Sequence, residues 1–170
     1  MVIILPIMFD SETIDMLSHA YQHELHNMYS YQKISNFLDV KGYKNLSKYW
    51  DDWSKEEYNH SQIVKEFCND NNILINMNSD ILLPDFDLEN FPITHFVDIT
   101  YDVEQKTSNI YNTMYFYSVD IKNGFLIDFA LGFLKEQREE TQKANMFRDS
   151  IKNIGDNTAI LQLFDNSFKG

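Results

Sequence analysis

Apolar residues recur along most of this chain at the three- and four-residue spacing of an amphipathic α-helix. Asp10 or Ser11 is suited to cap the first such segment, and Gly42 is suited to end it. A short break at Asn123-Gly124 separates the last two segments. The pattern predicts four long helices, over about residues 10–42, 43–71, 94–122 and 125–153, and Thr94 is a candidate cap of the third.

The two kinds of connection predict how these helices are arranged. Residues 73–93 have no helical period, and Pro84 and Pro92 disfavour a helix there. A stretched chain advances about 3.3 Å per residue against about 1.5 Å in a helix, so this segment can run back along a whole helix. We therefore expect an all-α four-helix bundle with a long crossover between parallel second and third helices, whereas the third and fourth are antiparallel.

The two ends of the chain add an arm and a fifth helix. We expect one domain over residues 1–170, with an arm at 1–9, the bundle at 10–153 and a short C-terminal helix at 157–168. The apolar arm is broken by Pro6 and lacks the basic start of a signal peptide, and no segment is long enough to span a membrane. The expected location is the cytoplasm. The apolar run 160–164 has no obvious place in a closed four-helix core, so we expect it to contact other subunits.

Acidic residues lie within the apolar stripe of every expected helix. Glu57 and His60 are three residues apart, so they share the helical face of Trp50 and Trp53. The other helices contribute Glu24, Glu104 and Glu140, with Glu136 or Gln137 beside Glu140. One such residue is usually a boundary residue that reaches solvent, but four in one core repel one another unless cations bind. Oxygen ligands with one imidazole suit iron or manganese, and this number of carboxylates suits two bridged ions; a polar centre without metal is the alternative.

Charge and composition narrow the function further. The net charge of −12 argues against a nucleic-acid partner and is compatible with attracting cations. The single Cys68 forms no internal disulfide. Three histidines on the first helix do not share the Glu24 face and are expected on the surface: His19, His23 and His26. Gly132 lies inside the fourth helix, where close packing is one explanation for it.

Five motifs, in order and spacing, resemble the non-haem bacterial ferritins over residues 10–168. They are His23-Glu24-Leu25, Tyr31, Glu56-Glu57-Tyr58-Asn59-His60, Val103-Glu104-Gln105 and Glu136-Gln137-Arg138-Glu139-Glu140. The predicted crossover is also that of ferritin-like bundles. Arg138 stands where bacterial ferritins often have histidine, and Gly132 replaces a usual aromatic residue.

The resemblance implies a ligand set for a diiron centre. Glu24, Glu57 and His60 would hold one iron, with Glu57 bridging, and Glu104 and Glu140 would hold the second, with Gln137 adjacent. A third iron site is implied at Glu56, Glu136, Glu139 and Glu140. Tyr31 matches a tyrosine that serves as hydrogen-bond partner or electron donor beside the centre.

Two related families fit less well. Bacterioferritin has a second Glu-x-x-His motif where this chain has Gln137-x-x-Glu140, and its haem-ligating methionine lies near the position of Tyr58. No haem is therefore expected. The mini-ferritins that coat DNA lack this intrachain ligand set.

The resemblance implies an iron-storage ferroxidase, which serves iron homeostasis. It would oxidise Fe²⁺ with O₂ or H₂O₂ and keep Fe³⁺ as mineral inside a hollow homo-oligomeric cage of 24 chains. One alternative is a ferritin-like diiron or dimanganese oxidase or peroxidase without a cage. Another is a bundle that only buffers metal.

Overall fold

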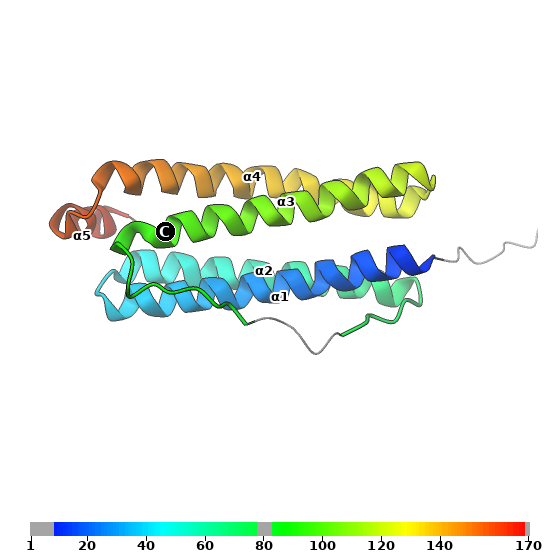
Figure 1. Ribbon diagram of the computed structural model, residues 1–170, viewed down its shortest axis with the longest axis horizontal. Coiled ribbons are helices and arrows are strands. Elements are labelled where there is room, and N and C mark those ends of the chain that lie inside the picture. Colours follow the sequence, from blue (N-terminus) through cyan, green and yellow to red (C-terminus); the bar gives the residue numbers. More distant parts are fainter. Residues whose placement is uncertain (1–8, 78–82, 169–170) are drawn as a thin grey trace, which may run out of the picture.

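Four long helices form a bundle in the computed structural model, which describes residues 9–77 and 83–168. They are α1 (Ser11–Val40), α2 (Lys44–Asp70), α3 (Phe96–Asp120) and α4 (Gly124–Ile154). A 3₁₀ turn, η1 (Ile93–His95), precedes α3, and the short α5 (Thr158–Ser167) lies at one end of the bundle (Figure 1). The expected all-α architecture is confirmed.

The helix ends follow from local hydrogen bonds. The Asp10 carboxylate accepts a hydrogen bond from the Thr13 amide at 2.8 Å, which caps α1. Gly42 has a φ of 93°, and this left-handed turn lets the Tyr43 amide donate to the Leu38 carbonyl at 2.9 Å. The prediction that Thr94 caps the third helix is wrong, because Thr94 lies within η1 and α3 begins only at Phe96.

Helices α2 and α3 point the same way, and the described parts of the segment between them, residues 71–77 and 83–92, lie along the bundle (Figure 1). Lys33 of α1 anchors this segment by donating to the carbonyls of Pro84 at 3.1 Å and Phe86 at 2.6 Å. Nearer α2, the Asn76 amide donates to the Ser18 hydroxyl at 2.9 Å. These bonds satisfy backbone groups that an extended chain leaves without ladder partners.

Two apolar clusters fill the two halves of the bundle. We call the cluster nearer α5 the tryptophan cluster; its buried members include Ile34, Trp50, Trp53, Phe96, Val97, Phe147, Ile151 and Leu161. The cluster at the other half is called the distal cluster; its buried members include Leu17, Val64, Met114, Leu126, Ala130 and Phe133. Along every long helix, the acidic residue of the apolar stripe falls between members of the two clusters.

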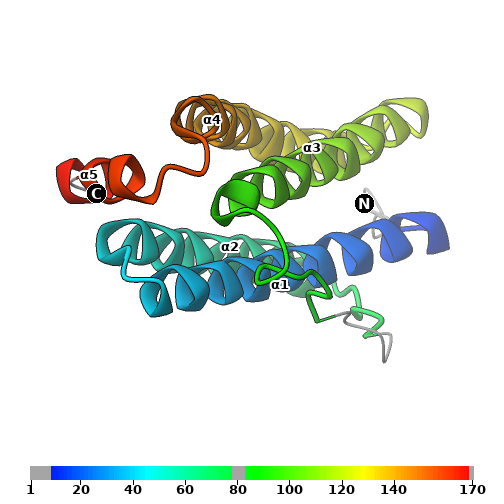
Figure 2. The same ribbon diagram turned by 60° about the vertical axis from the view of Figure 1, so that its left-hand side comes forward.

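Helix α5 packs against α2 and α4 at the end of the bundle (Figure 2). Leu161 is fully buried in the tryptophan cluster, so the expectation that the 160–164 run has no place in this chain's own core is wrong for Leu161. Asp165 is also buried, and its carboxylate accepts the Leu46 amide at 2.8 Å. Tyr43 gives α2 no side-chain cap, so α5 supplies one. Ile160 and Leu163 remain 46% and 68% exposed.

Gly132 lies on the exposed side of α4. A Cβ atom added there would meet nothing within 4 Å among the described residues. Close packing against the described part of this chain is therefore not the reason for this glycine.

Candidate metal centre

The middle of the bundle brings together polar side chains from all four long helices. Glu24 comes from α1, Glu57 and His60 from α2, Glu104 from α3, and Gln137 and Glu140 from α4. All six are at most 5% exposed. Each is placed inward by the same 3.6-residue period that buries the apolar residues before and after it.

The ligand atoms form two groups that share a residue. One oxygen or nitrogen from each of Glu24, Glu57 and His60 lies within 4.8 Å of the others, and the same holds for Glu57, Glu104 and Glu140. The geometry thus offers two neighbouring cation positions with the Glu57 carboxylate between them.

Two tyrosines anchor two of these carboxylates in a reciprocal arrangement. Tyr31 of α1 donates its hydroxyl hydrogen to Glu104 of α3, and Tyr111 of α3 donates to Glu24 of α1 at 2.5 Å. Each tyrosine lies seven residues after the glutamate of its own helix. The sequence motifs indicate Tyr31 but not Tyr111 as a residue of this centre, although the repeated Glu-x₆-Tyr spacing is a usable signal.

Gln137 gives Glu104 a further donor. Its amide nitrogen donates to the Glu104 carboxylate and, at 3.2 Å, to the Glu104 backbone carbonyl. In this arrangement Gln137 presents N–H groups, and its side chain would have to turn to offer an oxygen to a cation.

Without a cation, the pKa values of the buried carboxylates are raised, which favours their protonated form. Burial raises the pKa of Glu24 and Glu57 well above the usual range, and neighbouring carboxylates add to the rise. Burial and Glu104 raise the pKa of Glu140 to about 8. Burial alone would lower the pKa of His60, but Glu140, Glu24 and Glu136 together raise it. A cation would displace these protons, since it favours the charged form of each carboxylate.

Two carboxylate oxygens indicate whether a cation suits this centre. Glu24 Oε2 and Glu57 Oε1 are buried, and neither has a hydrogen-bond partner among the described residues. When both glutamates are ionised, each of these oxygens is a buried acceptor without a partner, which is destabilising, and a cation bound by both residues would satisfy both oxygens. Four carboxylates and one imidazole are ligands that suit iron or manganese. The residues therefore fit the implied metals.

The acidic residues of the implied third site are less closely assembled. Glu56 and Glu139 are exposed, and Glu56 lies 3.8 Å from the Lys143 ammonium group. The half-exposed Glu136 carboxylate approaches His60 Nε2 at 3.3 Å. Among the described residues, neither Glu56 nor Glu139 belongs to a group of three metal-binding atoms at short range. Their role in metal binding stays a prediction.

The prediction that all three histidines of α1 lie on the surface is wrong for His23. Its Nε2 atom is 2.9 Å from the Thr107 hydroxyl, between α1 and α3. Burial lowers the pKa of His23 to about 3, and His26 adds to the effect. His19 is exposed, as expected.

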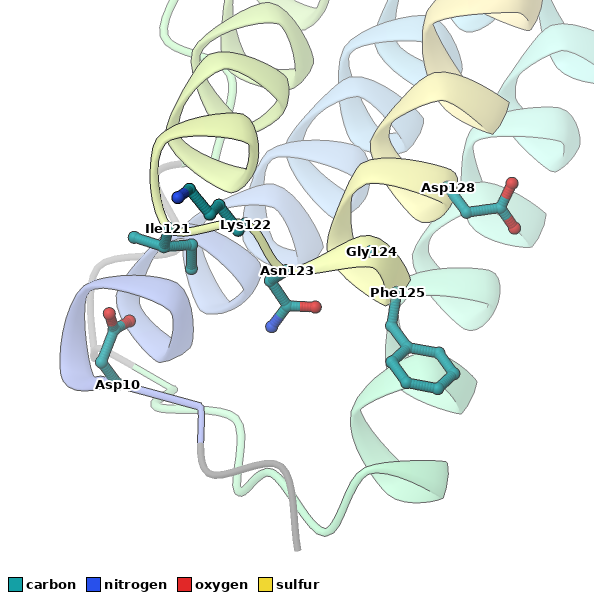
Figure 3. A pocket seen from close by; sticks show the side chains of 7 residues that line it. All are labelled: Asp10, Ile121, Lys122, Asn123, Gly124, Phe125 and Asp128. Carbon is teal, nitrogen blue, oxygen red and sulfur yellow. The ribbon is translucent and has the colours of Figure 1, made fainter.

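A large open pocket lies away from these carboxylates. It has a volume of about 620 Å³ and surrounds the turn between α3 and α4, with Asp10, Phe125 and Asp128 among its lining residues (Figure 3). None of the six centre residues lines it. This pocket is therefore not part of the candidate metal centre.

Residues 14–154 match the ferritin-like domain family, and the chain belongs to it. It is 25% identical over 158 residues to a bacterial non-heme ferritin of Staphylococcus saprophyticus, covering 93% of each chain. The resemblance drawn from the motifs is confirmed at the level of a non-haem ferritin.

Solved structures share the fold at low sequence identity. An open pore ferritin of the hyperthermophilic archaeon Archaeoglobus fulgidus superimposes with a TM-score of 0.85 at 16% identity, over 94% of this chain and 96% of that one. A humanized archaeal ferritin gives 0.86 at 19% identity, over 96% and 99%. A PmFTN variant soaked in iron gives 0.88 at 17% identity, over 94% and 100%. No helix among the described residues is long and apolar enough to cross a membrane.

Proposed function

We propose that this member of the ferritin family is an iron-storage ferroxidase of the cytoplasm, with Fe²⁺ and O₂ or H₂O₂ as its substrates. The observation that carries the proposal is the pair of buried ligand groups that share Glu57. Family membership supports iron as the metal, and two oxygens without partners, on Glu24 and Glu57, support cation binding at this place.

The chemistry follows from the charge of the centre. Entry of two Fe²⁺ displaces protons from the buried carboxylates, because their ionised form is the one that binds metal. Each Fe²⁺ then gives one electron to O₂, and the two electrons reduce O₂ to the level of peroxide. The remaining negative charge stabilises Fe³⁺ more than Fe²⁺, since attraction increases with the charge of the cation.

The chain's own hydrogen bonds keep the ligands in place during this change. Tyr31 and Gln137 hold Glu104, and Tyr111 holds Glu24, so these carboxylates need little reorganisation when charge increases between them. Tyr31 is also positioned beside the metal ligands as a candidate electron donor. Gln137 is neutral. Once its side chain has turned to offer the amide oxygen to iron, the contact would be weak and would let Fe³⁺ leave for a mineral.

Storage requires a closed shell of subunits. The family resemblance implies 24 chains, which at 20.2 kDa each would form a particle of about 485 kDa. The exposed Ile160 and Leu163 of α5 support a contact with other subunits, because the chain itself leaves them uncovered.

The test combines oxidation with particle mass. Fe²⁺ is added in air at two ions per chain, Fe³⁺ formation is followed by absorbance, and iron is then measured in the size-exclusion peak. The proposal predicts rapid oxidation and iron retained in a peak of several hundred kilodaltons. Rapid oxidation by one or two chains that retain no iron would favour an oxidase or peroxidase, and oxidation no faster than in buffer would refute the proposal.

A further inference from the structure

We propose that Asn27 is a positioning residue that sets the orientation of Glu57, and that Thr107 and His23 in turn hold Asn27. The inference rests on the proposed function, because it concerns the carboxylate shared by both cation positions. It identifies a part of the centre for which the Glu-x-x-His spacing gives no signal.

The side chain of Asn27 lies between three polar groups. Asn27 is fully buried and lies one turn after Glu24 on α1. Its amide nitrogen is 3.2 Å from Glu57 Oε2 and 3.0 Å from the Thr107 hydroxyl oxygen. The two N–H groups of one amide thus serve the bridging carboxylate and a residue of α3 at the same time.

The partners of Thr107 favour one direction for the hydrogen bonds along the series Glu57–Asn27–Thr107–His23. The Thr107 hydroxyl donates to the Val103 carbonyl at 3.1 Å, so its oxygen is left to accept. It accepts from Asn27, and it lies 2.9 Å from His23 Nε2, which donates to it in the tautomer that carries the ring hydrogen on Nε2. A reversed Asn27 amide would place its oxygen against the Thr107 oxygen, whose hydrogen goes to Val103, and against Glu57 Oε2, which only accepts in the ionised form that binds a cation. Asn27 is therefore held as a donor toward Glu57.

Glu57 depends on its hydrogen bond from Asn27 more than Glu24 and Glu104 depend on theirs from the tyrosines. Tyrosine hydroxyls hold Glu24 and Glu104, whereas the carboxylate of Glu57 receives its cross-helix N–H from Asn27. Binding of Oε2 by Asn27 leaves Oε1 without a partner, and Glu57 is the member common to both ligand groups. A ligand that serves two cations must be held closely, so loss of the anchor should weaken the second binding event most.

The test is an anaerobic titration of metal-free protein with Co²⁺, followed by the visible absorption of the bound ion. The parent should bind two Co²⁺ per chain. Asn27→Leu keeps the branched shape and the number of side-chain heavy atoms and removes the donor, and we expect the second Co²⁺ to bind about tenfold more weakly while the first is retained. Thr107→Val should weaken binding of the second Co²⁺ by a smaller factor, because Asn27 remains but is no longer held by the Thr107 hydroxyl.

Ser30→Ala is the matched control. Ser30 is a buried α1 residue whose hydroxyl donates to the His26 carbonyl of the same helix rather than to a carboxylate of the centre. It should bind both Co²⁺ as the parent does. If Asn27→Leu does not fold, Thr107→Val carries the test. The inference would be overturned if the folded Asn27→Leu and Thr107→Val variants bound the second Co²⁺ as tightly as the parent. It would also be overturned if Asn27→Leu and Ser30→Ala lost the binding of both Co²⁺ ions to the same extent. A parent that binds no pair of ions would overturn the proposed function itself.

Discussion

The middle of the bundle and its two apolar clusters are built on opposite principles. In the tryptophan and distal clusters, burial of apolar side chains stabilises the fold. In the middle, four buried glutamates destabilise the metal-free fold, because each must either hold a proton or leave a charge beside like charges. The clusters therefore hold the carboxylates together, whereas the carboxylates are suited to binding cations rather than to stabilising the fold.

The largest expected effect is a change of metal-free stability with pH. The folded pKa of Glu140, about 8, exceeds the ordinary value of 4.5, so between these limits the folded state holds more protons than the unfolded state. The free energy of unfolding should therefore fall as pH rises from about 5 to 8, by about 1.4 kcal/mol per pH unit for each proton retained. The raised pKa of His60 acts in the same direction, since its contribution is lost as pH rises.

Urea denaturation of metal-free protein at several pH values measures this slope. Saturating Mn²⁺ is the control. It should reverse the sign of the slope, so that stability rises with pH, because metal binding releases the protons. Glu57→Gln should make the metal-free slope shallower. A metal-free stability that is flat or rises over this range would mean that the glutamates are not protonated by burial.

The next effect belongs to the tryptophan cluster. Trp50 is fully buried, donates to the Thr100 hydroxyl at 3.0 Å and contacts the rings of Trp53 and Phe96. Trp50→Ala should lower the metal-free free energy of unfolding by about 3–5 kcal/mol. Glu57→Ala is the comparison variant and should leave it equal or higher. If Glu57→Ala lowers the metal-free free energy of unfolding as much as Trp50→Ala does, the contrast between the carboxylates in the middle of the bundle and the tryptophan cluster is contradicted.

A smaller effect is expected where α5 joins the tryptophan cluster. Asp165→Ala removes the only side-chain cap seen on α2 among the described residues, the bond to the Leu46 amide. The cost should be about 1–2 kcal/mol in thermal or chemical unfolding. Asn166→Ala, at an exposed neighbouring position, is the control. Equal stability of the two variants would show that α5 does not cap α2.

The smallest effect is expected at Gly132, outside both regions. Gly132→Ala should raise metal-free stability by about 0.5–1 kcal/mol, because alanine favours a helix and the new methyl group meets nothing nearby. Chemical denaturation measures the gain. A loss of stability would show that a group outside this chain packs on that face of α4.

The sequence predicted the parts of this molecule that depend on helical period. The inward positions of Glu24, Glu57, His60, Glu104 and Glu140 follow from spacing alone, and so does the extended crossover. The roles of these residues as metal ligands remain a prediction until binding is measured.

Contacts between helices could not be read in the same way. Asn27 and Thr107 look like ordinary polar residues, because their function depends on partners 30 and 80 residues from Asn27. The capping of α2 by Asp165 joins residues 119 positions apart. Such pairings depend on how the helices are aligned with one another, which periodicity within one helix does not determine.

Anaerobic Fe²⁺ titration by calorimetry, of the parent and of Glu57→Ala, tests the central claim most directly. Glu57 is common to both ligand groups. The parent should bind two Fe²⁺ per chain at the centre and release protons, and Glu57→Ala should lose the paired binding although it folds at least as well without metal. Paired binding retained by Glu57→Ala, or no binding beyond weak surface sites in the parent, would contradict the account.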